Sequence, residues 1–162
     1  MTNKFQIFDG PCKPKIDRQR PKCPYWDHYV IGEGDELIGT SGLGICLAVT
    51  LYNPQNKRGI LAHIAGFGNM FDKEALEPNT AIDILLKNLN GSGDLDYRKL
   101  EATLSGEGGF PTKYEGRRRN SLIIGERINH YGIPIIGEDL CSPYGREVFL
   151  DCSNGNVEVY RI

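Results

Sequence analysis

The residues best suited to chemistry lie in one stretch, TSGLGICLAVTLYNPQNKRGILAHI, which covers residues 40–64. Cys46 follows a glycine-bracketed turn and enters an apolar segment, and His63 lies near the end of the next apolar segment. A thiolate is a nucleophile, and an imidazole can take the proton of a thiol near neutral pH. If the fold brings the two side chains together, they form a nucleophile and base pair.

The elements that must position this pair are two strands. Residues 45–52 favour a strand by their β-branched and aromatic content, NPQNKR supplies a turn, and residues 59–65 return as a second strand. When the numbers of opposed residues add to an odd sum, one face of the pair is wholly apolar: Leu47, Val49, Leu51, Ile60, Ala62 and Ile64. An even sum would mix the leucines of that face with His63 and Gly59. The odd register is therefore favoured, and it places Cys46 and His63 together on the opposite face, either opposed or diagonal.

The loop before the cysteine can serve the same chemistry. Gly42 and Gly44 let the chain turn tightly, and the backbone N–H groups that lead through Ile45 to the cysteine could stabilise an oxyanion next to the sulfur. Spacing alone leaves a second interpretation open, in which Cys46 is an ordinary buried thiol and His63 a hydrogen-bonded strand residue. If the pair is functional, we expect Cys46 to have a larger thiolate fraction than a free thiol.

The same stretch resembles CheD, the family of chemoreceptor glutamine deamidases. Members carry a T-x-G-L-G-S-C motif that leads into an apolar strand, followed by a G-G-x-x-H strand. Three further blocks agree with the family in order: YVIGEGDELIGT, IGERINHYGIPIIGEDL and YGREVFLDCSNGNVEVYRI. The resemblance spans about residues 27–162. It implies that Cys46 is the nucleophile, that His63 is the base, and that Thr40 is the hydroxyl residue that positions the histidine.

The resemblance also implies a fold and a reaction. The fold is α+β, with mixed β-sheets packed as a sandwich and flanking helices, an architecture related to the catalytic domains of cytotoxic necrotizing factor toxins. The reaction is hydrolysis of a protein glutamine side chain to glutamate through a thioester, with release of ammonia and without a metal or organic cofactor. The implied partners are a protein with a target glutamine, either a chemoreceptor or another protein, and a CheC-like phosphatase.

Departures from the family pattern concern the substrate more than the nucleophile. Ile45 stands where serine is usual, and residues 64–69 replace the M-L-P that follows the histidine. The helix expected after the I-G-x-R segment is cut short, because only INHY separates Arg127 from Gly132. Two alternatives therefore stay open: a toxin-like effector deamidase that acts on a host protein, and a catalytically silent binding module with the CheD fold.

Composition limits the other classes of function. The chain has 162 residues, of which 40% are hydrophobic and 25% charged, and its net charge is −2. These values are typical of one soluble globular domain and give no drive toward nucleic acid or membrane. No apolar run reaches the ~18 residues of a membrane span, and the first residues lack the apolar core of a signal peptide. We expect a cytoplasmic protein with reduced thiols.

The other cysteines do not predict a metal site. Cys12 and Cys23, with His28 as the nearest histidine, are poorly spaced for zinc and one ligand short. His28 is therefore interpreted as a surface or packing residue. Cys152 alternates with apolar residues in a strand-like run and is expected in the core, whereas nothing identifies Cys141 as catalytic.

The chain is expected to divide into an arm and a domain. Residues 1–24 carry four prolines among many charges and are predicted to form an arm that can be flexible and adds little to the core, while residues 25–162 form the deamidase domain. A helix is predicted over residues 78–90, with one apolar face and a proline in its first turn. The pattern predicts strands within residues 99–106 and 133–140, and a final hairpin that turns at Asn154–Gly155.

Overall fold

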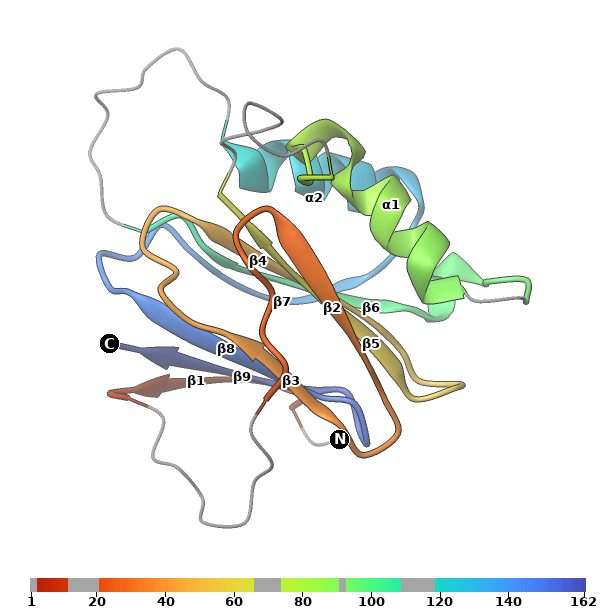
Figure 1. Cartoon of the computed structure of the whole chain (residues 1–162), viewed down its shortest axis with the longest axis horizontal. Coiled ribbons are helices and arrows are strands. Elements are labelled where there is room, and N and C mark those ends of the chain that lie inside the picture. Colours follow the sequence, from red (N-terminus) through yellow and green to blue (C-terminus); the bar gives the residue numbers. More distant parts are fainter. Residues whose placement is uncertain (1–2, 12–20, 66–73, 91–92, 109–118) are drawn as a thin grey trace.

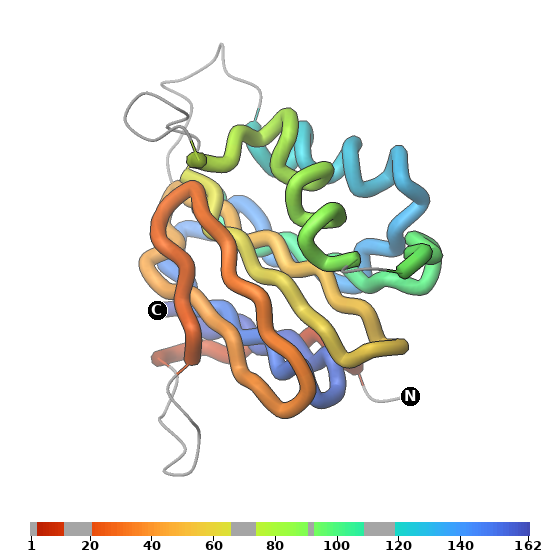
Figure 2. The backbone as a smooth tube through the Cα atoms, turned by 45° about the vertical axis from the view of Figure 1, so that its right-hand side comes forward, coloured from red at the N-terminus to blue at the C-terminus, as the bar shows by residue number. Residues whose placement is uncertain are grey.

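The computed structural model describes residues 3–11, 21–65, 74–90, 93–108 and 119–162. These residues form three layers, with a four-stranded sheet, a five-stranded sheet and a layer of two α-helices (Figure 1). Figures 1 and 2 agree that both helices cover the face of the five-stranded sheet that points away from the four-stranded sheet. The predicted α+β sandwich with flanking helices is confirmed.

The five-stranded sheet carries the predicted hairpin at its centre. Its order is β2-β5-β4-β6-β7, and only β6 and β7 pair in parallel. The strands are β2 (His28–Glu33), β4 (Leu47–Asn53), β5 (Arg58–Ile64), β6 (Glu101–Gly106) and β7 (Ile135–Leu140). In the hairpin, Leu47 pairs with Ile64 and Ala48 pairs with His63, so the odd register is confirmed.

The four-stranded sheet joins the two ends of the chain. Its order is β1-β9-β8-β3, with β1 parallel to β9 and the other pairs antiparallel. The strands are β1 (Phe5–Asp9), β3 (Leu37–Thr40), β8 (Arg146–Asp151) and β9 (Asn156–Arg161). The predicted final hairpin is confirmed as β8 and β9, and Gly155 at its turn has a φ of +78°.

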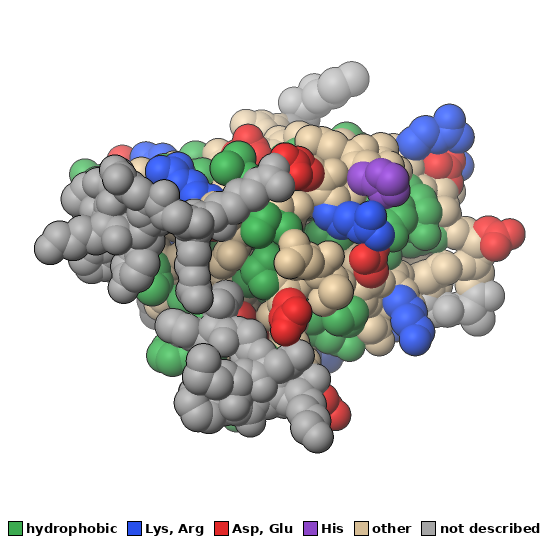
Figure 3. Space-filling model, turned by 90° about the horizontal axis from the view of Figure 1, so that it is seen from above, with side chains coloured by type: hydrophobic (Ala, Val, Ile, Leu, Met, Phe, Trp, Pro, Cys, Tyr) green, Lys and Arg blue, Asp and Glu red, His purple; other side chains and the backbone are tan. Residues whose placement is uncertain are grey.

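The helices pack on the apolar face of the hairpin. α1 (Pro78–Asn90) has the predicted bounds, and it buries the face made by Ala81, Ile82, Leu85, Leu86 and Leu89. α2 (Asn120–His130) lies beside it, and a short 3₁₀ turn, η2 (Tyr97–Lys99), precedes β6. Seen from this helical side, the described hydrophobic, basic and acidic side chains are interspersed (Figure 3). No described helix has the length and apolarity needed to cross a membrane.

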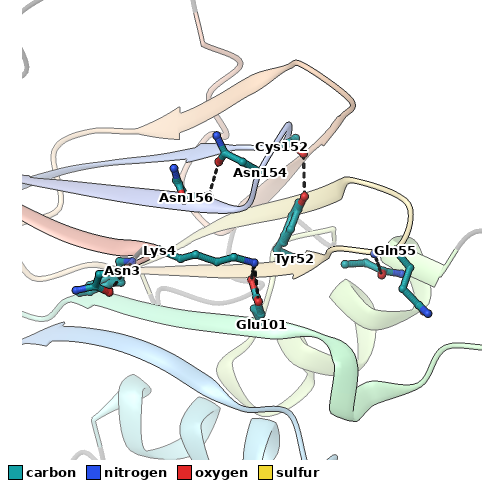
Figure 4. A network of polar contacts seen from close by, with 10 residues as sticks. Asn3, Lys4, Tyr52, Gln55, Glu101, Cys152, Asn154 and Asn156 are labelled. Atoms are coloured by element: carbon teal, nitrogen blue, oxygen red, sulfur yellow. Dashed lines mark hydrogen bonds and ion pairs between the residues drawn. The ribbon is translucent and has the colours of Figure 1, made fainter. Parts of the chain in front are cut away.

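A second core lies between the two sheets. It includes Cys46, Ala48 and Leu61 from the other face of the hairpin, together with Val148 and Cys152. Cys152 is fully buried, as predicted. The Tyr52 hydroxyl donates a hydrogen bond of 3.1 Å across the layers to the Cys152 carbonyl (Figure 4). Cys46 and His63 therefore lie on the face that the two sheets enclose.

The prediction that residues 1–24 add little to the core is wrong for β1. Phe5 is 8% exposed, and its ring packs so closely on Gly137 of β7 that a Cβ there would lie 2.1 Å from the Phe5 Cγ. Lys4 also forms an ion pair of 2.8 Å with Glu101 (Figure 4). The strand was missed because its partner, β9, lies at the other end of the chain, so no local pattern indicates the pairing. Cys12 lies outside the described residues, and Cys23 is exposed.

The helix expected near the I-G-x-R segment does end early, at His130, but the expectation that it begins after this segment is wrong. α2 begins at Asn120, so this segment forms the later part of the helix and does not precede it. Ser121, Ile124 and Ile128 form its buried side, with the spacing expected for one helix face. Gly125 inside the segment weakens the helical pattern, and Gly132, with a φ of +70°, follows the helix end.

Candidate active site

The candidate site forms where the two sheets meet. Thr40 ends β3 of one sheet, and His63 is the second-last residue of β5 in the other. The Thr40 Oγ1 and His63 Nδ1 atoms form a hydrogen bond of 2.8 Å, and both residues are buried. The family resemblance implied this contact, which ties the imidazole of one layer to a hydroxyl of the other.

Cys46 lies diagonal to His63 on the same face of the sheet. Ala48 is paired with His63, and Cys46, one residue before β4 begins, precedes Ala48 by two residues. Extending the register of β4 and β5 by one residue therefore places Cys46 diagonal to His63. The Cys46 carbonyl accepts a hydrogen bond of 2.8 Å from the Glu107 N–H, which holds the cysteine against the end of β6. Within the described part of the chain, the His63 Nε2 atom is buried and has no hydrogen-bond partner. The ring nitrogen that Thr40 does not hold is thus available to a thiol or a substrate.

The environment of the pair favours its neutral forms. Burial raises the pKa of the Cys46 thiol, and the charge of Asp27 raises it further. Burial also lowers the pKa of His63, although the charge of Asp27 acts in the opposite direction. At neutral pH the resting pair is therefore a thiol and a neutral imidazole. The expectation that Cys46 has a larger thiolate fraction than a free thiol is wrong, because sequence spacing carries no information on burial.

The loop before Cys46 is held by its own backbone. Gly42 has a φ of +71°, and its carbonyl accepts a hydrogen bond of 3.0 Å from the Gly44 N–H. The Gly44 carbonyl in turn accepts one of 2.7 Å from the Gly108 N–H. Within the described residues, the N–H groups of Ile45 and Cys46 donate no hydrogen bond. If the loop binds an oxyanion, these two N–H groups are better placed to do so than that of Gly44.

A pocket of about 550 Å³ opens beside the histidine. The described residues that line it are Cys23, Pro24, Tyr25, Trp26, His28, Thr40, Ser41 and His63. Tyr25 and Trp26 are 83% and 66% exposed, so they present aromatic surface beside the site. Within the described residues, no group of three or more histidine, cysteine or acidic side chains could hold a metal ion.

Sequence reasoning missed the segment from Tyr25 to His28 as part of the site. His28 pairs directly with His63 in the ladder between β2 and β5, so both side chains lie on the same face. The buried Asp27 donates its N–H to the His63 carbonyl, at 2.7 Å. The histidine and the acidic residue were visible in the sequence, but only knowledge that β2 pairs with β5 would place them here.

Comparisons with known proteins find a matching family model and relatives that align with most of this chain. The family model described as CheD chemotactic sensory transduction matches residues 72–161, which follow Thr40, Cys46 and His63 in the chain. The protein named "Probable chemoreceptor glutamine deamidase CheD" of Pyrococcus abyssi is 31% identical over 147 residues, which cover 83% of this chain and 87% of the relative. The "Chemoreceptor glutamine deamidase CheD" of Thermotoga maritima is 27% identical over 139 residues, with the same coverage of 83% and 87%. The crystal structure of hypothetical protein YfiH from Bacillus licheniformis is more distant, with a TM-score of 0.46 and 12% identity over 86% of this chain and 64% of that one.

Proposed function

The chain belongs to the CheD family, and from that premise we propose that it hydrolyses the side-chain amide of a protein glutamine, yielding glutamate and ammonia. The observation that carries the proposal is the buried hydrogen bond between Thr40 and His63, with Cys46 diagonal to the imidazole. A hydroxyl, an imidazole and a thiol, drawn from three separate strands or loops, meet at this point of the fold. They are the groups that a cysteine amidohydrolase needs.

In the first half of the reaction, Cys46 attacks the substrate amide. His63 Nε2 takes the proton of the thiol while the sulfur bonds to the amide carbon, and the carbonyl oxygen becomes an oxyanion. The N–H groups of Ile45 and Cys46 stabilise that oxyanion. His63 then gives the proton to the amide nitrogen, the C–N bond breaks, and ammonia leaves a thioester on Cys46.

In the second half, water restores the enzyme. His63 takes a proton from water as the water oxygen bonds to the thioester carbon. The C–S bond then breaks, the proton returns to the sulfur, and the product is glutamate. A neutral resting pair suits both halves, because His63 must begin each half without a proton on Nε2.

Thr40 orients the base and selects its tautomer. For Nε2 to accept a proton, the single proton of the neutral ring must lie on Nδ1, where it is donated to Thr40 Oγ1. Without this acceptor the ring could rotate, or carry its proton on the wrong nitrogen. Thr40 therefore acts through His63 and does not need to touch the substrate.

The surface around the site favours a protein substrate with apolar residues near the glutamine. Tyr25 and Trp26 line the pocket beside His63, and Ile45, 51% exposed, directly precedes the nucleophile. We take a chemoreceptor as the first substrate to test, because the relatives are named for that activity. Because Ile45 stands at the family's serine position, another protein as substrate is the second candidate.

The test is a deamidation assay by mass spectrometry. The purified chain is incubated with chemoreceptor signalling domains, and their peptides are mapped for the conversion of glutamine to glutamate while ammonia is measured. The Cys46→Ser protein is the negative control. We expect conversion at specific glutamines that is absent with Cys46→Ser. Conversion of glutamines only in proteins other than chemoreceptors would support the effector alternative. If the wild type converts no more glutamine than Cys46→Ser does, the silent binding module is supported.

A further inference from the structure

Asp27 occupies a position that packing alone does not explain. It is 4% exposed, lies next to β2, and has a φ of +57°. Buried carboxylates are costly unless hydrogen bonds or opposite charges compensate them, and positive φ is uncommon outside glycine, asparagine and aspartate. Two unfavourable features at one residue beside the candidate base point to a role in the site.

The hydrogen bonds of Asp27 connect it to the end of the histidine strand. Its N–H donates to the His63 carbonyl at 2.7 Å, and its Oδ1 accepts from the Ala65 N–H at 2.8 Å. Its carbonyl accepts from the Leu76 N–H at 2.6 Å, which links the same point to the segment before α1. Asp27 thus binds the backbone at His63 and two residues beyond it.

We propose that Asp27 is a positioning residue for His63: it holds the strand end that carries the base, and its negative charge stabilises the imidazolium that forms during the reaction. The second part of this inference, the stabilisation of the imidazolium, rests on the proposed function. When His63 accepts the thiol proton, a positive charge appears on a buried ring whose described hydrogen-bond partner is a neutral hydroxyl. A buried carboxylate nearby offsets that charge without a direct hydrogen bond to the ring.

The electrostatics of the pair support this role. The charge of Asp27 raises the pKa of His63 and also that of Cys46. The other titratable groups in the described lining of the pocket are Cys23, Tyr25 and His28. Glu107, whose N–H donates to the Cys46 carbonyl, directs its carboxylate to Ser121. Removing the Asp27 charge should therefore lower the pKa of both members of the pair.

Asp27→Asn is the most informative variant. Asparagine tolerates positive φ and keeps an oxygen that can accept from the Ala65 N–H, so the variant removes the charge and keeps the hydrogen bond. Asp27→Gly relaxes the backbone and removes the whole side chain. Asp35→Asn makes the same chemical change at an exposed residue in the turn between β2 and β3 and serves as the matched control.

Two readouts are measured on each variant. The first is the pH dependence of Cys46 alkylation by iodoacetamide, followed by peptide mapping, which needs no substrate. The second is kcat for glutamine deamidation, together with the pH at which kcat/KM falls on the acid side. Thermal unfolding reports whether each variant is folded.

For Asp27→Asn we expect alkylation of Cys46 to begin at lower pH than in the wild type. We also expect kcat to fall about tenfold, which is a fraction of the rate enhancement that a general base usually contributes. The acid limb of kcat/KM should also move to lower pH, because the pKa of His63 falls. A residue that only supports the fold would not raise thiol reactivity and lower turnover together. Asp27→Gly should shift alkylation in the same direction and lose more activity, and Asp35→Asn should match the wild type.

Unchanged alkylation and unchanged kcat in a folded Asp27→Asn protein would overturn the proposal. If neither variant folds, the proposal is also overturned, because Asp27 would then be required for folding itself. If alkylation shifts as expected but the wild type deamidates no protein, the charge effect of Asp27 stands and the proposed function fails. The two ideas can therefore fail separately.

Discussion

Two buried polar clusters of this fold differ in the charge that they carry at neutral pH. In the first, Asp139 accepts hydrogen bonds from Arg146 Nε at 2.8 Å and from Arg161 Nη2 at 2.6 Å, and Arg146 is fully buried. Burial by itself raises the pKa of Asp139, but the hydrogen bonds from Arg161 and Arg146 outweigh it and lower the pKa overall. This cluster is therefore charged at rest.

The second cluster, Thr40, Cys46 and His63, is neutral at rest. Burial pushes the pKa of the thiol up and that of the imidazole down, so neither group carries a charge at neutral pH. The comparison shows that the fold holds a buried charge where arginines pair with it, and that Thr40, Cys46 and His63 form no ion pair among the described residues. In our account, charge forms on Cys46 and His63 only when the substrate is present.

The largest effect should come from removing the base of the neutral cluster. His63→Ala should lower kcat for deamidation by about a thousandfold or more, as expected when a nucleophile loses its partner. Its melting temperature should fall, because the variant also removes the buried hydrogen bond between Thr40 and His63 and leaves a cavity, so thermal unfolding is measured to confirm that the protein is folded. A His63→Ala protein with near-normal turnover would show that this cluster does no chemistry.

A substitution in the charged cluster should lower the free energy of unfolding. Asp139→Asn leaves Arg146 buried without its counter-charge and should cost about 3–5 kcal/mol in the free energy of unfolding, measured by urea titration. Asp94→Asn, at an exposed carboxylate, should cost almost nothing. Because the pKa of Asp139 is lowered in the folded protein, its contribution is present above its unfolded pKa and is lost as the pH falls through the folded pKa. The difference between wild type and Asp139→Asn should therefore shrink in acid, and a constant difference would contradict this reasoning.

The N-terminal strand offers a stability test away from both clusters. Phe5→Ala should destabilise the protein by about 3 kcal/mol, because it empties the space between β1 and Gly137. Phe8→Ala on the same strand is the control: Phe8 is 38% exposed and stacks on Tyr160 at the surface, so its loss should be much smaller. Equal and negligible effects would restore the interpretation of residues 1–24 as an arm outside the core.

The smallest expected effect is a loss of kcat in Thr40 variants, which tests whether the Thr40 hydroxyl positions His63. Thr40→Val keeps the shape of the side chain but removes the acceptor for His63 Nδ1, so kcat should fall by about tenfold to a hundredfold. Thr40→Ser keeps the hydroxyl and should retain most of the activity. Equal losses in both variants would mean that the threonine methyl, and not its hydroxyl, positions the ring.

Local patterns predicted the parts of the fold that depend on local sequence. The periodicity of residues 78–90 was sufficient for α1, and the apolar face of the hairpin was sufficient for the odd register that brings Cys46 and His63 together. β1 and the segment from Tyr25 to His28 could not be placed in this way. Their roles depend on pairing with β9 and β5, and strand pairing between distant segments leaves no periodic signal in either one.

The ionisation of the site could not be predicted from the sequence either. Proximity of a thiol and an imidazole suggested a thiolate, whereas burial raises the pKa of the Cys46 thiol and lowers the pKa of the His63 imidazole. Burial depends on the second sheet, which packs over Cys46 and His63 only in the folded chain.

The central claim, that Cys46 attacks a glutamine carboxamide with His63 as its base, is tested most directly by covalent trapping. A glutamine peptide whose carboxamide is replaced by a chloroketone is incubated with the protein, and the modified residue is located by peptide mapping. We predict that the label lies on Cys46, that it forms much more slowly in His63→Ala, and that free glutamine peptide competes with it. Labelling of another cysteine, or labelling of Cys46 that is indifferent to His63→Ala, would contradict the account.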